Sequence, residues 1–204
     1  IPIMEGDEEL LLDSKPDFIG INYYQTTNIE SFYGNSNTIA PSKNTVISSD
    51  EHDEKENKND DSFRIIKNEF LKLTDWNWTI DPIGLEVGLR RLYSRYNLPI
   101  LISENGLGAF DKLENDLSIK DHYRIDYLKQ HIQAIDRAIN VGVEVIGYCT
   151  WSFQDLFSWL NGYQKRYGFV FIDRDEESEK ELKRYKKNSF YWYKKVIESN
   201  GKNL

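Results

Sequence analysis

The chain has 204 residues, of which 39% are hydrophobic, and a formal net charge of −8. This apolar content is enough to form a sizeable core, whereas the acidic balance argues against nucleic acid or an anionic membrane as a partner. The only cysteine, Cys149, excludes an internal disulfide, and its place in an apolar run predicts a small core residue rather than a nucleophile. No run is long enough to span a bilayer and no secretion signal opens the chain, so we expect a soluble, cytoplasmic protein, cut from a longer chain.

Apolar runs and cap residues predict alternating strands and helices. A first strand is expected at about 17–24, followed by a polar stretch that reads as an exposed, mobile insertion at about 41–62. Asp81-Pro82 predicts a helix start, with one apolar face continuing to about Tyr96, and a strand follows around 100–104.

A second series of elements completes the alternation. Residues 118–121 resemble a capping box, and the next helix should present Leu128, Ile132, Ile135 and Ile139 on one face. A strand is expected at 143–150, a short apolar run at 168–173, and a final helix at about 187–198, whose apolar face would carry Phe190, Tyr193 and Ile197.

Repeated strand–helix units are typical of an α/β fold with parallel strands. Three units are too few to close an eight-stranded barrel, which needs about 250 residues. We therefore interpret residues 1–204 as the C-terminal part of one (β/α)8 TIM barrel, about strands 6–8 with their helices.

Glu104 is the strongest candidate for a catalytic side chain. It follows the apolar run Ile100-Leu101-Ile102 and is followed at once by Asn105-Gly106. A buried parallel strand would deliver this carboxylate to its C-terminal tip, where barrels keep their active sites. The alternative is a solvated glutamate that opens an Asn-Gly turn.

Three motifs together resemble the retaining β-glucosidases and 6-phospho-β-glycosidases of glycoside hydrolase family one. They are Asn22-Tyr23-Tyr24, Ser103-Glu104-Asn105-Gly106 and Trp151-Ser152-Phe153-Gln154-Asp155, in the family's order. The resemblance implies that Glu104 is the nucleophile and that the Tyr24 hydroxyl orients it. Strand periodicity puts Asn22 on the same face as Tyr24, and the resemblance implies that Asn22 binds substrate. Trp151 would be a platform beneath the sugar ring. The alternative for both Tyr24 and Trp151 is an aromatic residue of the core.

A second set of residues distinguishes the substrate class. Family members that act on unphosphorylated glucosides typically carry a glutamate where this chain has Ser158, and a carboxylate would repel a phosphate. Ser158, Lys165 and Tyr167 instead offer two hydroxyls and one ammonium, a set suited to a 6-phosphate. The alternative is a turn with a surface lysine. Trp159 resembles the 6-phospho-β-galactosidase pattern.

One part of the family pattern is missing from these residues. The family's acid/base glutamate lies in an Asn-Glu-Pro motif, whereas the only Asn-Glu here, Asn68-Glu69, is followed by Phe70. We therefore expect a 6-phospho-β-glucosidase fragment that is inactive by itself and associates through open barrel edges. Its substrates would be phosphorylated disaccharides or aryl β-glycosides, and no metal or other cofactor is implied. The alternatives are a β-glucosidase for unphosphorylated sugars and a non-catalytic binding module.

Overall fold

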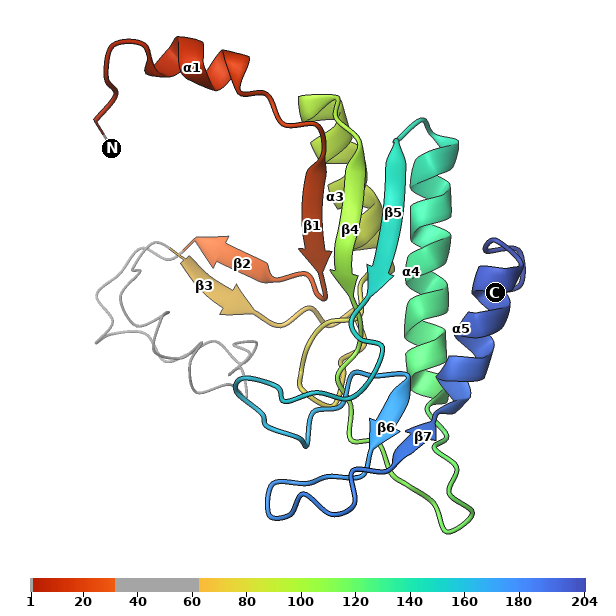
Figure 1. The fold of residues 1–204 in the computed structure, drawn as a ribbon. Coiled ribbons are helices and arrows are strands. Elements are labelled where there is room, and N and C mark those ends of the chain that lie inside the picture. The colour runs from red at the N-terminus through yellow and green to blue at the C-terminus, as the bar shows by residue number, and fades with distance from the viewer. Residues whose placement is uncertain (1, 32–62) are drawn as a thin grey trace.

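The computed structural model describes residues 2–31 and 63–204, so the expected insertion at about 41–62 lies outside the described residues. Its central sheet has three strands, β1 (Ile19–Tyr23), β4 (Ile100–Asn105) and β5 (Val145–Thr150), in the order β1-β4-β5. Both pairings are parallel, as the alternation of elements predicts. The three strands run side by side and end at the same edge, where β6 (Val170–Ile172) and β7 (Arg184–Lys186) also lie (Figure 1).

Three helices follow the sequence prediction closely: α3 (Pro82–Tyr96), α4 (His122–Asn140) and α5 (Asn188–Glu198). Asp81 caps α3, since its carboxylate accepts a 2.8 Å hydrogen bond from the Gly84 amide. The helix ends where Asn97 adopts a left-handed conformation, with φ 50°, which asparagine tolerates better than most residues.

The predicted capping box at 118–121 is wrong. Helix α4 begins only at His122, with Asp121 as its N-cap, and the Asp121 side chain makes no capping hydrogen bond to the helix backbone. The Asp121 carboxylate bonds the Ser189 amide and hydroxyl and the Arg124 guanidinium instead. The Ser118 hydroxyl donates to Asp116 in a local turn. Neither the Ser118 nor the Asp121 side chain is therefore left to cap the helix, because Asp121 is engaged by Ser189.

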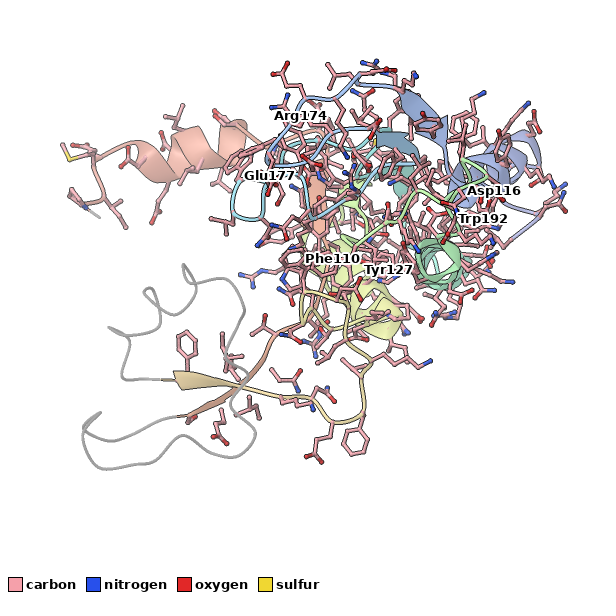
Figure 2. All side chains as sticks on the ribbon, turned by 90° about the horizontal axis from the view of Figure 1, so that it is seen from below. Phe110, Asp116, Tyr127, Arg174, Glu177 and Trp192 are labelled. Carbon is pink, nitrogen blue, oxygen red and sulfur yellow. The ribbon has the colours of Figure 1, made fainter. Side chains whose placement is uncertain are left out.

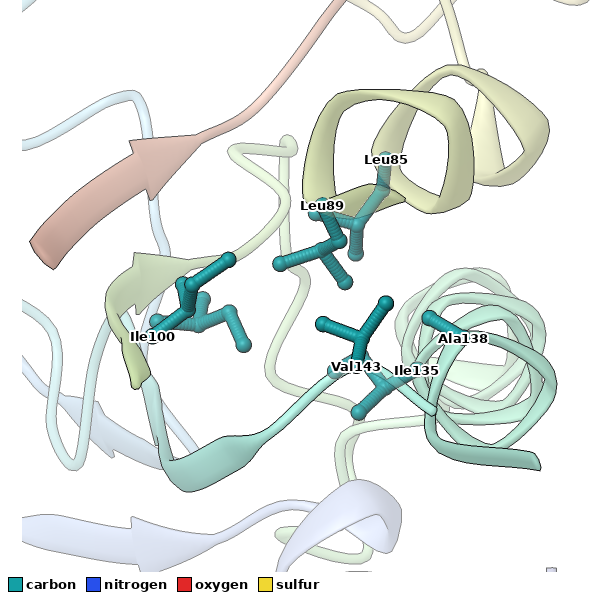
Figure 3. Packing of buried hydrophobic residues seen from close by; sticks show 7 residues of the cluster. Leu85, Leu89, Ile100, Ile135, Ala138 and Val143 are labelled. Atoms are coloured by element: carbon teal, nitrogen blue, oxygen red, sulfur yellow. The ribbon is translucent and has the colours of Figure 1, made fainter. Parts of the chain in front are cut away.

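The main apolar core lies between the sheet and helices α3 and α4. Figure 3 shows Leu85 and Leu89 of α3 facing Ile100 of β4, with Ile135 of α4 beside them. Each fully buried leucine or isoleucine contributes about 2 kcal/mol from the removal of apolar surface from water. On the predicted helix faces Leu128 and Ile135 are buried, but Ile139 and Ile197 are exposed.

The opposite face of the sheet is open in the described part of the chain. Asn22 is exposed on β1, and Ile146 of β5 keeps 53% of its surface accessible. Cys149 is also exposed, which contradicts its predicted place in the core. The reason is tertiary: an apolar strand buries its residues on both faces only when both faces are covered.

Several short elements were not expected, whereas β6 lies within the expected apolar run at 168–173. Helix α1 (Asp7–Asp13) buries none of its residues and extends away from the sheet (Figure 1). Strands β2 (Asn28–Ser31) and β3 (Phe63–Ile66) form an antiparallel pair, as do β6 (Val170–Ile172) and β7 (Arg184–Lys186). Among the described residues, no helix is both long enough and apolar enough to cross a bilayer.

Candidate active site

A β-bulge decides which way Glu104 points. In the parallel pair of β1 and β4, Ile21 is opposite Ile102, but the next residue, Asn22, is already opposite Glu104. Strict alternation would put Glu104 on the buried face with Ile102. The extra residue, Ser103, shifts the alternation, so Glu104 shares the open face with Asn22. Bulges often re-aim side chains next to active sites.

Glu104 and Tyr24 are in direct contact, as the resemblance implies. The Tyr24 hydroxyl donates a 2.6 Å hydrogen bond to Glu104 Oε2. Burial raises the pKa of Tyr24, and its hydrogen bond to Glu104 raises it further, so the phenol keeps its proton and remains a donor. Two neighbouring strand ends thus place a donor beside a half-buried carboxylate.

Asn105 fixes the ends of β1 and β4 behind this pair. Its side chain is fully buried, and its Nδ2 donates to the Tyr23 carbonyl at 2.7 Å and to the Tyr127 hydroxyl at 3.1 Å. Its Oδ1 accepts from the Tyr148 hydroxyl at 2.7 Å. Tyr127, on α4, donates in turn to the Tyr24 carbonyl at 2.9 Å. Figure 2, viewed onto the ends of the strands, labels Tyr127.

Asn22 and Trp151 also lie at this edge of the sheet. Asn22 Oδ1 accepts a 2.7 Å hydrogen bond from the Ser103 hydroxyl, so the side chain is held beside Glu104. Trp151 is half-buried, and its amide donates to the Asn105 carbonyl at 2.8 Å. A Cβ atom on Gly106 would lie 1.9 Å from the Trp151 carbonyl oxygen, so this close approach requires glycine.

The three predicted phosphate ligands differ in their surroundings. Lys165 is only 1% exposed, and its ammonium lies 3.6 Å from the centre of the Trp78 ring. Tyr167 is also buried, and its ring meets the ring of Tyr24 edge-on at 6.3 Å. The structure therefore brings the Tyr167 ring against Tyr24, the hydrogen-bond donor to Glu104, and places Lys165 over Trp78, which also packs against Tyr24. Ser158 is half-buried in the preceding loop, where its backbone pairs with Gly162.

Trp159 lies next to Ser158 and is 93% exposed. Its indole is therefore available for contacts from outside the described residues. The roles of Asn22, Trp151, Ser158, Trp159, Lys165 and Tyr167 in substrate binding stay predictions.

Sequence reasoning missed two aromatic residues of the site. Trp78 packs edge-on against Tyr24, with ring centres 5.7 Å apart, and lies under the Lys165 ammonium. The Trp76 ring centre lies 5.1 Å from the same ammonium, and the ring packs at a tilt against Phe110, which Figure 2 labels. The signal was the Asp75-Trp76-Asn77-Trp78 stretch just before α3, which pairs two indoles in a polar loop. Within the described ranges, no group of three or more His, Cys, Asp or Glu side chains is placed to hold a metal.

Comparison with known families agrees with this arrangement. The family model for glycosyl hydrolase family 1 matches residues 1–202. A carboxylate at a strand tip, oriented by a tyrosine in a parallel α/β sheet, is consistent with the chemistry of glycoside hydrolases. The chain belongs to glycosyl hydrolase family 1.

Individual relatives include phosphoglucosidases and a β-glucosidase. The chain is 52% identical over 208 residues to the aryl-phospho-beta-D-glucosidase BglC of Bacillus subtilis (strain 168), covering 99% of this chain and 42% of the relative. It is 40% identical to the 6-phospho-beta-glucosidase AscB of Escherichia coli (strain K12), and the match covers 98% of this chain and 38% of the relative. A solved structure, the family 1 β-glucosidase from Thermotoga maritima, matches with a TM-score of 0.77 and 30% identity, covering 98% and 39%. The chain thus spans about two fifths of the length of these relatives.

Proposed function

We propose that this chain supplies the nucleophile and the phosphate-binding residues of a retaining 6-phospho-β-glucosidase. The observation that carries the proposal is the 2.6 Å hydrogen bond from Tyr24 to Glu104 at the ends of two neighbouring parallel strands. The order of the motifs and of the three strand–helix units favours the C-terminal part of the barrel, about strands 6–8. The similarity to the two phosphoglucosidases supports a phosphorylated substrate.

The proposed reaction is a double displacement. Glu104 attacks the anomeric carbon and forms a glycosyl ester, while a second carboxylic acid, about 5 Å away, protonates the leaving oxygen. Water then cleaves the ester with that second group as base. Because the chain has no Asn-Glu-Pro, we propose that this acid comes from outside these residues. Tyr24 holds Glu104 in position throughout.

The remaining site residues would bind the sugar. Lys165, Tyr167 and Ser158 would bind the 6-phosphate, Trp151 would pack against the sugar face, and Asn22 would bond a ring hydroxyl. A sugar phosphorylated during uptake is found in the cytoplasm, so we propose that location for the enzyme.

Kinetics of the full-length protein test this function. We expect turnover of 4-nitrophenyl 6-phospho-β-glucoside and little turnover of 4-nitrophenyl β-glucoside. Glu104→Gln should abolish turnover without unfolding the protein, and a 2-fluoro sugar should label Glu104. The matched control is Glu114→Gln, which alters a partly exposed glutamate near Lys112. Equal turnover of both substrates, or an active Glu104→Gln variant, would overturn the proposal.

Trp159 favours one alternative substrate. Its resemblance to the 6-phospho-β-galactosidase pattern, together with its exposure on the loop that carries Ser158, makes the sugar epimer a separate question. The same assay with 4-nitrophenyl 6-phospho-β-galactoside decides it. A higher kcat/KM for that substrate would change the assignment to a phosphogalactosidase while leaving the roles of Glu104 and Tyr24 intact.

A further inference from the structure

A buried cluster of six charged side chains lies next to the proposed phosphate-binding residues. Three carboxylates and three cations take part, so their formal charges cancel. The members are Asp111, Asp121, Arg124, Asp155, Arg166 and Lys187, and all six have little or no exposed side-chain surface. Burying six charged side chains costs free energy unless each is paired. The presence of the cluster therefore needs a structural or functional reason.

The cluster joins four separate segments at the ends of the strands. Lys187, just before α5, contacts Asp111 in the loop after β4, and Asp155 in the loop after β5 at 2.6 Å. Arg124, in the first turn of α4, contacts Asp111 at 3.0 Å. Arg166 contacts Asp155 at 2.9 Å. Lys187 therefore links the loop after β5 to the loop after β4 through its two ion pairs.

Arg166 is fixed by its backbone as well as by its side chain. Its amide and carbonyl both pair with Ala109, each at 3.0 Å, and its carbonyl also accepts from Arg124 at 2.9 Å. Its guanidinium donates to the Ile172 carbonyl at 2.8 Å. The Asp155 carboxylate accepts from the Gly168 amide at 3.0 Å, so the segment is held on both sides of Tyr167.

Because side chains alternate along an extended segment, fixing Arg166 also fixes the directions of Lys165 and Tyr167. In an extended segment, residues i−1 and i+1 point away from the side of residue i. With Arg166 directed into the cluster, Lys165 and Tyr167 face the other way, toward Trp78 and Tyr24. A slip of one residue would bury Lys165 in the cluster and remove both groups from the site.

We propose that Arg166, held by Asp155, is a positioning residue for phosphate recognition: the buried cluster fixes the face on which Lys165 and Tyr167 are presented to the substrate. This inference rests on the proposed phosphate role of Lys165 and Tyr167. It predicts a defect confined to phosphorylated substrates, because Arg166 acts through these two neighbours and does not contact Glu104.

The test compares variants of the full-length protein on 4-nitrophenyl 6-phospho-β-glucoside and 4-nitrophenyl β-glucoside. Arg166→Met should raise KM for the phosphorylated substrate about tenfold with kcat within about twofold, and should leave the slow reaction of the other substrate unchanged. Arg166→Lys, which keeps the charge, should recover part of the loss. The matched control is Arg137→Met, which removes the exposed 2.7 Å ion pair between α4 and Glu86 of α3.

A double-mutant cycle separates positioning from general support of the fold. In a Lys165→Ala background, Arg166→Met should raise KM by clearly less than in the wild type, because the group it positions is already absent. If Arg166→Met fails to fold, Asp155→Asn, which keeps the side-chain shape, takes its place. Equal losses on both substrates, full additivity with Lys165→Ala, or loss of folding in every variant would overturn the inference. A wild type without preference for the phosphorylated substrate would instead refute the proposed function.

Discussion

At the scale of single residues, different side chains of the candidate site make different contacts. Glu104 and Tyr24 are joined by one short hydrogen bond, and Asn105 satisfies its whole amide group with Tyr23, Tyr127 and Tyr148. The Lys165 ammonium lies over the ring of Trp78, with 3.6 Å to the ring centre. Substitutions should therefore separate substrate recognition from the chemical step.

Loss of the Lys165 ammonium should weaken recognition of phosphate alone. In the full-length protein, Lys165→Ala should cost roughly 1.5–3 kcal/mol in kcat/KM for a phosphorylated aryl glucoside, the value of a charge-assisted hydrogen bond. Unphosphorylated substrates should be scarcely affected. Lys112→Ala, at a side chain that is 79% exposed, is the matched control. Equal losses on both substrates would mean that Lys165 is structural.

Loss of the Tyr127 hydroxyl should affect phosphorylated and plain substrates alike, in contrast to loss of the Lys165 ammonium. Tyr127→Phe removes the donor to the Tyr24 carbonyl and the acceptor for Asn105, so we expect a loss of about 1–3 kcal/mol in stability. Because the Tyr24–Glu104 geometry loosens, kcat should fall for phosphorylated and plain substrates alike. Tyr96→Phe, at the exposed end of α3, is the control. A kcat equal to that of the wild type would show that Tyr127 does not support the catalytic pair.

At the scale of elements, α4 does more than cover the sheet. It carries Tyr127 to the ends of β1 and β4, and one turn later it buries His131. The His131 ring stacks on Tyr127 with centres 3.9 Å apart, and Nδ1 lies 2.7 Å from the Tyr127 carbonyl. Since a carbonyl can only accept, Nδ1 carries the proton in the neutral ring.

The buried histidine should make stability depend on pH. Burial lowers the pKa of His131 to about 4, below the value of about 6.5 expected in the unfolded chain. Between these values the unfolded state binds more protons, so stability falls as pH decreases from 6.5 toward 4. The loss between pH 7 and pH 5 should be about 2 kcal/mol.

Urea unfolding at the two pH values measures this effect. His131→Gln should reduce the difference in unfolding free energy between pH 7 and pH 5, whereas His122→Gln, at an exposed position on the same helix, should leave it unchanged. The same pH dependence in His131→Gln as in the wild type would exclude His131 as its source.

At the scale of the whole molecule, the described sheet has two edge strands and an uncovered face. Strand β4 is central, so β1 and β5 carry backbone groups unpaired within this sheet. A groove of about 450 Å³ beside the end of β5 is lined by Phe153, Phe169, Phe190, Tyr193 and Ile197, among others. Open edges and exposed apolar patches promote association.

We therefore expect the 204-residue chain to associate and to lack hydrolytic activity by itself. Light scattering should show species larger than the 24.1 kDa monomer, and an aryl 6-phosphoglucoside should not be turned over. Ile146→Lys places a charge on an edge strand and should reduce association, whereas Ile139→Lys on α4 should not. A monomeric, active chain would contradict both expectations.

The sequence by itself determined the parallel α/β units and the bounds of α3, and the resemblance of its motifs to glycoside hydrolase family one implied the contact between Tyr24 and Glu104. These follow from local signals: apolar periodicity, the Asp81-Pro82 cap and a motif at a strand tip. Tertiary structure alone decided the bulge that turns Glu104 to the open face, the late start of α4, the exposure of Cys149 and the placement of Lys165 over Trp78. Each depends on a group that is far away in the sequence but close in space, such as Ser189 beside Asp121. No local pattern of residues encodes such a contact.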